Sequence, residues 1–108
     1  MISDDTSEPQ PSAHKIAILA ETFRLLGDPS RLRILLYCLQ SSRSVGDIAQ
    51  SLDLSQTLVS HHLRLLRGAR LVRSERRGKQ IFYEVADAHV STMLIDMASH
   101  IDEDHDDE

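Results

Sequence analysis

The sequence predicts a small, mainly helical domain with one β-hairpin, in the order four helices, two strands and a final helix. Apolar residues recur at helical spacing as far as Gly68. Beyond that glycine, two short runs rich in β-branched and aromatic residues enclose a Gly-containing turn, which is typical of a hairpin. With 108 residues and no internal repeat, the chain has room for one domain.

The predicted domain covers residues 14–103 and lies between two acidic ends, an arm of residues 1–13 and a tail of residues 104–108, which we expect to be flexible. The arm lacks the basic and apolar regions of a signal peptide, and no apolar run approaches the roughly 20 residues of a membrane span. The single cysteine, Cys38, excludes an internal disulfide framework. We therefore expect a cytoplasmic protein with no membrane partner.

The first two helices are predicted over residues 13–26 and 29–40. The first carries apolar residues on more than one flank, so it needs more than one packing partner. It ends at Gly27, and Asp28 and Pro29 supply the N-cap and the first residue of the second helix. Cys38 is expected to be buried and unreactive. The inward positions expected in the second helix are Leu32, Leu35, Leu36 and Leu39.

The third and fourth predicted helices form a helix-turn-helix. The third covers residues 45–52, and Ser55 N-caps the fourth, which continues to about Arg67. Two short helices joined by a short turn are typical of a DNA-binding unit whose second helix, the recognition helix, enters the major groove. The side chains expected to face inward from the recognition helix are Leu58, Val59, Leu63 and Leu66.

The residues after the recognition helix change to a β pattern. Strands are predicted over residues 71–76 and 80–85, with residues 77–79 as the turn between them. A hairpin directly after a helix-turn-helix is a wing, so the predicted fold is a winged helix-turn-helix. A last helix is predicted over residues 87–103, and its apolar stripe consists of Val90, Leu94, Met97 and Ile101.

Charge is distributed unevenly along the chain. The whole sequence has a formal net charge of −5, which by itself argues against nucleic-acid binding. Residues 55–83, however, carry +6, and the remaining residues carry −11. A basic segment in the recognition helix and wing is the pattern expected of a chain that meets phosphates with one face.

The recognition helix and the wing supply two classes of predicted DNA contact. Short polar side chains in the first turns of a recognition helix can reach base edges, whereas cationic side chains contact phosphates or the minor groove. His61 and His62 point about 100° apart on a helix, so at most one faces DNA, and we choose His61. The predicted base-reading residues are Ser55, Gln56, Thr57, Ser60 and His61, and the predicted backbone contacts are Arg64, Arg67, Arg76, Arg77 and Lys79.

Four metal-ligating side chains lie near the two ends of the last helix, Asp87 and His89 at its start and His100 and Glu103 towards its end. Carboxylates and imidazoles in this mixture suit Zn(II) and Co(II). The two histidines are separated by about 16 Å and nearly three turns, so both pairs share a face but cannot meet within one chain. An antiparallel last helix from a second copy would join them, which predicts a homodimer, through the first and last helices, with two equivalent ions. The competing interpretation is a solvated polar face.

Four short sequence motifs occur one after another along the chain. They are LGDPSRLRIL at residues 26–35, SVGDIA at 44–49, LSQTLVSHHL at 54–63 and RGKQIFY at 77–83. Over about residues 15–103 the chain resembles the ArsR/SmtB family of bacterial winged-helix repressors that sense metals. The final D-x-H-x10-H-x2-E pattern, at Asp87, His89, His100 and Glu103, is similar to the zinc site on the last helix of the zinc- and cobalt-sensing members.

The resemblance implies a homodimeric repressor, not an enzyme, that binds a two-fold symmetric operator when metal-free. Binding of Zn(II), or of Co(II) or Ni(II), would release the DNA and derepress genes for metal efflux or sequestration, and no small organic substrate is implied. His100 is implied to use its second ring nitrogen to reach a backbone carbonyl near Arg70, which couples the metal site to the recognition helix. Members that sense soft metals place cysteines near the third helix, where this chain has Ser44, so that thiolate site is absent.

Two other functions stay open from the sequence. A winged-helix regulator of this kind can respond to another signal or to none, although oxidation of Cys38 is a poor candidate because the sequence holds no resolving cysteine. A metal-dependent hydrolase is the weakest alternative. It would need an open coordination position and a pocket, and four ligands between two packed helices leave neither.

Overall fold

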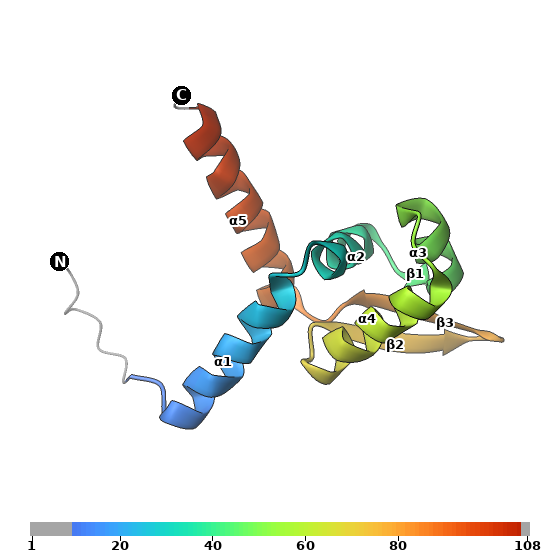
Figure 1. Cartoon of the computed structure of the whole chain (residues 1–108), viewed down its shortest axis with the longest axis horizontal. Helices are drawn as coiled ribbons and strands as arrows, with labels where there is room; N and C mark the ends of the chain where they lie inside the picture. Colours follow the sequence, from blue (N-terminus) through green and yellow to red (C-terminus); the bar gives the residue numbers. More distant parts are fainter. Residues whose placement is uncertain (1–9, 107–108) are drawn as a thin grey trace.

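The computed structural model describes residues 10–106, with side chains described as far as Glu103, and these residues form five helices and three strands (Figure 1). Their order confirms the predicted mainly helical winged helix-turn-helix. The helices are α1 (Ala13–Leu26), α2 (Pro29–Gln40), α3 (Val45–Leu52), α4 (Gln56–Gly68) and α5 (Ala88–Asp106), and the strands are β1 (Arg43–Ser44), β2 (Val72–Arg77) and β3 (Gln80–Val85).

The first four helices each begin at a side-chain N-cap. Ser12, Asp28, Ser44 and Ser55 each accept a hydrogen bond from the backbone N–H three residues later, at 3.0 to 3.2 Å. Caps of this kind stabilise a helix by about 0.5–2 kcal/mol, because they satisfy N–H groups that have no partner inside the helix. The predicted caps at Asp28 and Ser55 are thereby confirmed.

The hydrophobic core lies between α2, α3, α4, the sheet and the first turns of α5. Two predicted core residues are wrong, since Leu36 and Leu58 are each 38% exposed. The core takes Ile34 from α2 instead, and a helix that buries Ile34 and Leu35 turns Leu36 away from that face. The largest fully buried side chains are Ile34, Leu35, Ile48, Leu63, Leu66, Val59, Val72 and Cys38.

The sheet has the order β1-β3-β2 and is antiparallel throughout. Strand β1 was not predicted; it pairs with Phe82 and Tyr83 of β3 and so attaches the hairpin to the segment before α3. Arg77 pairs with Gln80, so the turn contains two residues rather than the predicted three. The first of them, Gly78, has φ 65°, a left-handed conformation that glycine adopts without strain.

Helices α1 and α5 project from the body on the same side and diverge from one another, whereas the hairpin points to the other side (Figure 1). Helix α1 buries only Leu25 and Leu26. The radius of gyration is 16.3 Å, larger than the roughly 13 Å typical of a compact domain of about 100 residues. The large apolar side chains left exposed on these helices are Ile16, Ile18, Leu19, Phe23, Ile95, Met97 and Ile101.

Only parts of the predicted acidic arm and tail can be compared with the structure. The backbone of α5 is helical to Asp106, so the start of the predicted tail at residue 104 lies within a helix. The predicted arm at residues 1–9 and the last two residues of the tail lie outside the described residues. Among the described helices, none has the length and apolar character needed to cross a membrane.

Candidate nucleic-acid interface and metal centre

The polar face of α4 and its N-cap, Ser55, carry every side chain that the sequence analysis predicts to read bases. Helix α4 buries Val59, Leu63 and Leu66, so helical periodicity directs the polar residues between them outward. The predicted residues Ser55, Gln56, Thr57, Ser60, His61, Arg64 and Arg67 are all exposed. Five of them, Gln56, Thr57, Ser60, His61 and Arg64, line one shallow hollow.

The two adjacent histidines of α4 have different environments. His61 is exposed, and His62 is 7% exposed with its Nε2 4.0 Å from Oδ2 of Asp28. Burial lowers the pKa of His62, an effect that the Asp28 carboxylate opposes, and its Nδ1 has no hydrogen-bond partner among the described residues. His62 is thus a packing residue, which leaves His61 as the histidine able to face DNA.

The basic residues of the wing are not equivalent. Arg77 is held against the protein surface, because Nη2 lies 3.2 Å from Oε1 of Glu75 and donates to Oγ of Ser42 at 3.3 Å, and its guanidinium stacks over Phe82. Arg76 points to the other face of β2, and within the described part of the chain its one hydrogen bond is donated to the carbonyl of Gly78, at 3.4 Å. Arg76 is therefore the freer cation of the pair for a phosphate contact.

A polar cluster on the outer face of the sheet fixes the base of the wing. Ser42 donates to Glu84 at 2.9 Å, and Arg73 pairs with the same carboxylate at 2.6 Å. These contacts hold the pKa of Glu84 below its usual range, with the Ser42 hydrogen bond as the largest cause. Because Ser42 lies more than 30 residues from its partners, sequence periodicity could not reveal this contact.

At the start of α5, the structure brings Asp87 and His89 together. Oδ1 of Asp87 accepts hydrogen bonds from the backbone N–H groups of His89 and Val90, at 3.0 and 3.2 Å, so Asp87 caps the helix, a role that the sequence analysis did not assign to it. The same oxygen lies 3.5 Å from Nδ1 of His89. The His89 side chain is 97% exposed and that of Asp87 is 57% exposed, so both can reach a ligand outside this chain.

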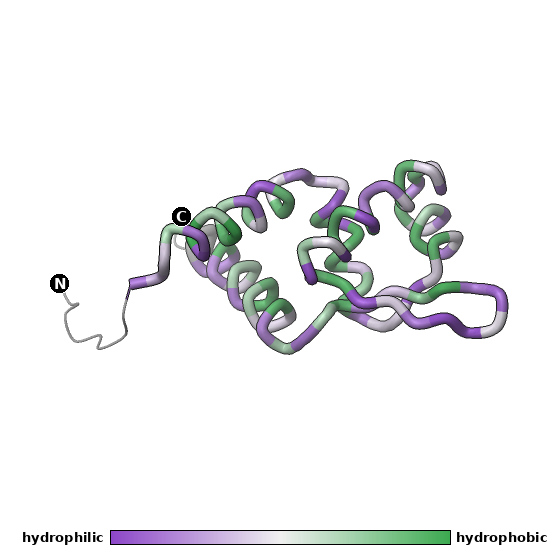
Figure 2. Tube along the Cα trace, turned by 90° about the horizontal axis from the view of Figure 1, so that it is seen from below, coloured by the Kyte–Doolittle hydropathy of each residue, from purple (hydrophilic) through white to green (hydrophobic). Residues whose placement is uncertain are grey.

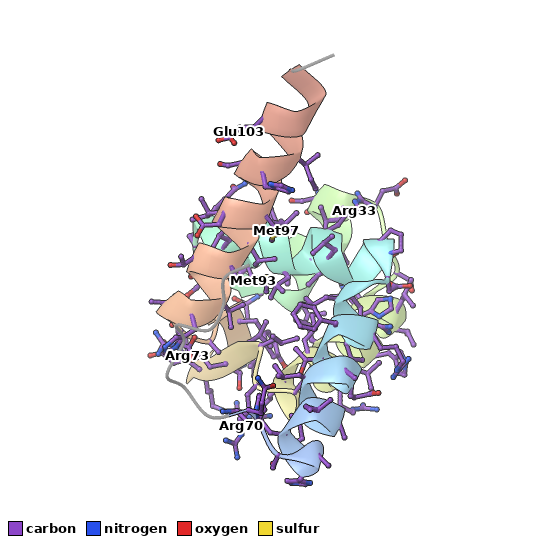
Figure 3. All side chains as sticks on the ribbon, turned by 90° about the vertical axis from the view of Figure 1, so that its left-hand side faces the viewer. Arg33, Arg70, Arg73, Met93, Met97 and Glu103 are labelled. Carbon is purple, nitrogen blue, oxygen red and sulfur yellow. The ribbon has the colours of Figure 1, made fainter. Side chains whose placement is uncertain are left out.

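His100 and Glu103 are both exposed and lie three residues, about one turn, apart in α5. Figure 3 shows Glu103 near the projecting end of this helix. Within the described residues of one chain, no three His, Cys, Asp or Glu side chains form a group that could hold a metal ion. Each chain therefore offers two separate pairs of donors. Their imidazole and carboxylate atoms fit a borderline or hard divalent ion, and neither pair alone completes a shell.

Arg70 follows α4 in a left-handed conformation, with φ 62°. The next residue, Leu71, accepts a hydrogen bond from the N–H of Ala86 at 3.0 Å, which places the end of the recognition helix beside the start of α5. Figure 3 shows Arg70 and Glu103 at opposite ends of the molecule. His100, one turn from Glu103, therefore lies far from the Arg70 carbonyl of its own chain.

Cys38 does not have the environment of a reactive thiol. Its side chain is 2% exposed, and burial raises its pKa to about 12. Since the thiolate is the form that reacts with oxidants and binds metals, the prediction of a buried, unreactive cysteine is confirmed.

Hydrophilic and apolar residues gather on different parts of the molecule. Figure 2 shows hydrophilic residues at the far end of the hairpin, and apolar stretches along the projecting helices. The hairpin end is the site of Arg76, Arg77 and Lys79, all exposed. One half of the molecule thus presents cations and the other presents uncovered apolar surface.

Comparison with known proteins agrees with this geometry. Residues 28–74 match the family model of the bacterial regulatory proteins of the arsR family. The chain is 40% identical over 85 residues to a Synechocystis transcriptional repressor SmtB homolog, covering 79% of this chain and 64% of that protein. It is 36% identical over 97 residues to the transcriptional repressor SmtB of Mycobacterium tuberculosis, covering 89% of this chain and 72% of that protein.

The fold is also shared with a solved structure. A homodimeric winged helix-turn-helix DNA-binding domain from Mycobacterium bovis superposes with a TM-score of 0.85 at 24% identity, covering 95% of each chain. At that level of identity the likeness concerns the fold.

Proposed function

Because the chain belongs to the arsR family of bacterial transcriptional regulators, we propose that it is a repressor that binds operator DNA as a homodimer and releases it on binding Zn(II). Co(II) and Ni(II) are the alternative inducers. The repressor role is supported by the Synechocystis relative, which is named as a transcriptional repressor. The genes controlled would encode metal efflux or sequestration. The protein belongs to a class of regulators, not of enzymes.

The proposed operator contact uses α4 and the wing. The exposed face from Ser55 to His61 enters a major groove, Arg64 and Arg67 lie along the phosphates, and Arg76 and Lys79 reach the adjacent backbone from the wing. Arg77 contributes less, because it is already paired with Glu75. Two copies related by a two-fold axis would present two such surfaces to successive grooves, about 34 Å apart.

The proposed dimer buries the apolar faces of α1 and α5. Phe23 is 59% exposed and Met97 is 51% exposed, and most of the other large hydrophobic residues that are more than half exposed lie on the same two helices. Exposed apolar patches of this extent mark protein interfaces rather than solvated surface. Helix α1 is apolar on more than one flank and therefore needs a further packing partner, which a second copy would supply.

The observation that carries the proposed metal site is the arrangement of two donor pairs at two ends of one exposed helix. Asp87 and His89 lie 3.5 Å apart at the start of α5, and His100 and Glu103 lie towards its end. An antiparallel pair of α5 helices would join one pair from each copy into a four-ligand site, twice per dimer. When bound, zinc would supply a fixed link between the two chains.

The proposed coupling runs between chains. The hydrogen bond from Ala86 to Leu71 keeps the start of α5 next to Arg70, so the His100 that reaches this position comes from the second copy. Its second ring nitrogen would donate to a carbonyl near Arg70 and bias the end of the recognition helix. By linkage, metal then weakens DNA binding by the same factor by which DNA weakens metal binding.

The test is a titration of labelled operator complex with Zn(II), Co(II), Ni(II) and a thiol oxidant. We expect release by one or more of the metals and none by the oxidant, because Cys38 is buried. His89→Gln and His100→Asn should weaken zinc binding and abolish zinc-induced release, while Asp96→Asn, an exposed carboxylate on the same helix, should leave both unchanged. If His100→Asn or His89→Gln kept both zinc affinity and release, the assignment of these ligands would be wrong.

A further inference from the structure

A polar cluster joins the end of α2, strand β1 and the start of α3, and Arg43 of β1 is at its centre. The guanidinium lies 3.9 Å from the centroid of the Tyr37 ring, Nε donates to the Tyr37 carbonyl at 3.3 Å, and Nη2 donates to Oε1 of Gln40 at 3.0 Å. Nη1 lies 3.8 Å from Oδ2 of Asp47, in the first turn of α3. The Arg43 side chain is 20% exposed, so its cation is committed to the protein itself.

The carboxylate of Asp47 connects the other members of the cluster. Its Oδ1 accepts hydrogen bonds from the hydroxyls of Tyr37 at 3.0 Å and Ser51 at 3.1 Å. The backbone N–H of Asp47 donates to Oγ of Ser44, the N-cap of α3, at 3.2 Å. The side chains of the cluster thus hold β1 against both α2 and α3. Lysine could not replace Arg43 here, because it has neither the planar fork nor the stacking surface of a guanidinium.

The backbone of Arg43 makes a second attachment, to the wing. Arg43 pairs with Tyr83 of β3, and the next residue, Ser44, pairs with Phe82 (Figure 1). Strand β3 lies between β1 and β2 in the sheet, so β1 holds the edge of the hairpin that β2 does not cover. Arg43 therefore joins the wing by its backbone to two helices by its side chain.

Without β1, the hairpin would be attached to the domain mainly at its base. There the N–H of Ala86 donates to the carbonyl of Leu71 at 3.0 Å, close to the end of α4. A two-stranded hairpin is at best marginally stable alone, and one held at a single end can pivot about that end. The pairing with β1 is a second attachment, which restricts such a pivot.

The recognition helix α4 depends on the same helix that the cluster holds. Ile48 of α3 and Val59 and Leu63 of α4 belong to one buried core, so the position of α4 follows that of α3. We propose that Arg43 is a positioning residue for operator binding, which holds the wing at the offset from α4 at which both contact one duplex. The inference rests on the proposed DNA contact of α4 and the wing, and adds to it a residue that does not touch DNA.

The test is a double-mutant cycle on operator binding by the full-length protein without metal. Arg76→Ala should weaken binding by about tenfold in the wild type but by no more than about twofold in Arg43→Gln, because a wing that pivots has already lost that contact. Arg64→Ala, on α4, should cost about tenfold in both backgrounds. A general loss of stability would not distinguish Arg76 from Arg64. Equal costs of Arg76→Ala in the two backgrounds would contradict the proposal.

Two further variants act as controls. Arg43→Lys keeps the charge without the fork and the stack, so it should behave as Arg43→Gln does, and wild-type behaviour would show that the charge alone matters and would overturn the proposal. Arg33→Gln removes an arginine of α2 whose one hydrogen bond in the described part of the chain goes to the Leu52 carbonyl of α3, at 3.0 Å. In that background Arg76→Ala should still cost about tenfold.

A measurement without DNA separates this inference from the proposed function. Amide hydrogen exchange at residues 81–83 should be faster in Arg43→Gln and Arg43→Lys than in the wild type, and unchanged in Arg33→Gln. Exchange at the buried residues Leu63 and Leu66 should stay slow, which shows that the domain is folded. Wild-type exchange at residues 81–83 in both Arg43 variants would overturn the proposal. A failure of zinc to release the operator would leave this result unaffected.

Discussion

The half of the molecule proposed to read DNA, formed by α3, α4 and the hairpin, is complete in one chain, whereas the half proposed to sense metal, formed by α1 and α5, is not. The exposed polar face of α4 is backed by Val59, Leu63 and Leu66, and the wing is fixed at its base by Ser42 and Glu84. The projecting helices instead expose large apolar residues and separate donor pairs. In the proposed dimer, the distance between the two DNA-binding surfaces would depend on how α1 and α5 pack against the second copy. Such an arrangement suits a protein that changes between two conformations.

The largest effect is expected from a charge placed on the apolar face of α1, because this face is proposed to form the dimer. Phe23→Asp places a charge where the proposed dimer buries an aromatic ring that is 59% exposed in the single chain. We expect a folded monomer whose operator affinity falls by at least a hundredfold, roughly the loss of one half-site. Sedimentation and a binding titration measure the two effects.

The matched control for this variant is Ala13→Asp, which adds the same charge to the first residue of the same helix, where a negative charge is favourable. It should remain dimeric and bind operator as the wild type does. A dimeric Phe23→Asp variant would place the interface elsewhere.

Two neighbouring arginines of the wing are expected to contribute unequally to operator binding. Arg76→Ala should weaken operator binding by about tenfold and reduce the salt slope by roughly one for each phosphate that is no longer neutralised. Arg77→Ala should cost less, since Glu75 and Phe82 already hold that guanidinium. Binding measured over a range of salt concentrations gives both values, and a larger effect of Arg77→Ala than of Arg76→Ala would reverse the assignment.

The smallest expected effect concerns the pH dependence of folding. Burial lowers the pKa of His62, so the folded state keeps it neutral while the unfolded chain takes up a proton below its ordinary value of 6.5. The free energy of unfolding therefore falls as pH drops, by up to about 1.4 kcal/mol per pH unit below that value. The charged groups around the ring are Asp28, which opposes the shift, and Arg31 and His61, which add to it.

Unfolding by urea at pH 7.5 and pH 5.5 tests this effect. His62→Gln should remove much of the loss of stability between the two conditions, while His61→Gln, which removes only the smallest of the causes acting on His62, should retain most of it. Asp28 has a lowered pKa too, chiefly through the backbone hydrogen bond from Arg31, but its contribution is lost at more acidic pH. Equal pH dependence in the wild type and His62→Gln would show that His62 does not cause it.

Local patterns in the sequence were sufficient for most of the fold. Caps at Asp28 and Ser55 and the change of period after Gly68 act over a few residues, so they predicted the helices and the hairpin. Whether Leu36 is buried or exposed could not be decided from local patterns. Its helix has apolar residues on adjacent flanks, and tertiary packing selected Ile34 and Leu35.

The features of the candidate sites also differ in whether neighbouring residues alone could predict them. The exposure of His61 and the Asp87–His89 pair follow from helix geometry and capping, which are local. Strand β1 and the contacts of Ser42 depend on residues far apart in sequence, so no periodicity marks them. The identity of the DNA contacts and metal ligands stays a prediction, because those partners complete surfaces that one chain leaves open.

The central claim, that each metal site is shared between two chains, is tested most directly by mixing two defective variants. Homodimers of His89→Gln or of His100→Asn have both sites incomplete, but a mixed dimer has one complete site and one site that lacks both histidines. Random pairing makes about half of the dimers mixed. We predict that exchange of the two variants restores tight zinc binding at one ion per mixed dimer. Zinc binding no tighter than in the separate variants would contradict a shared site.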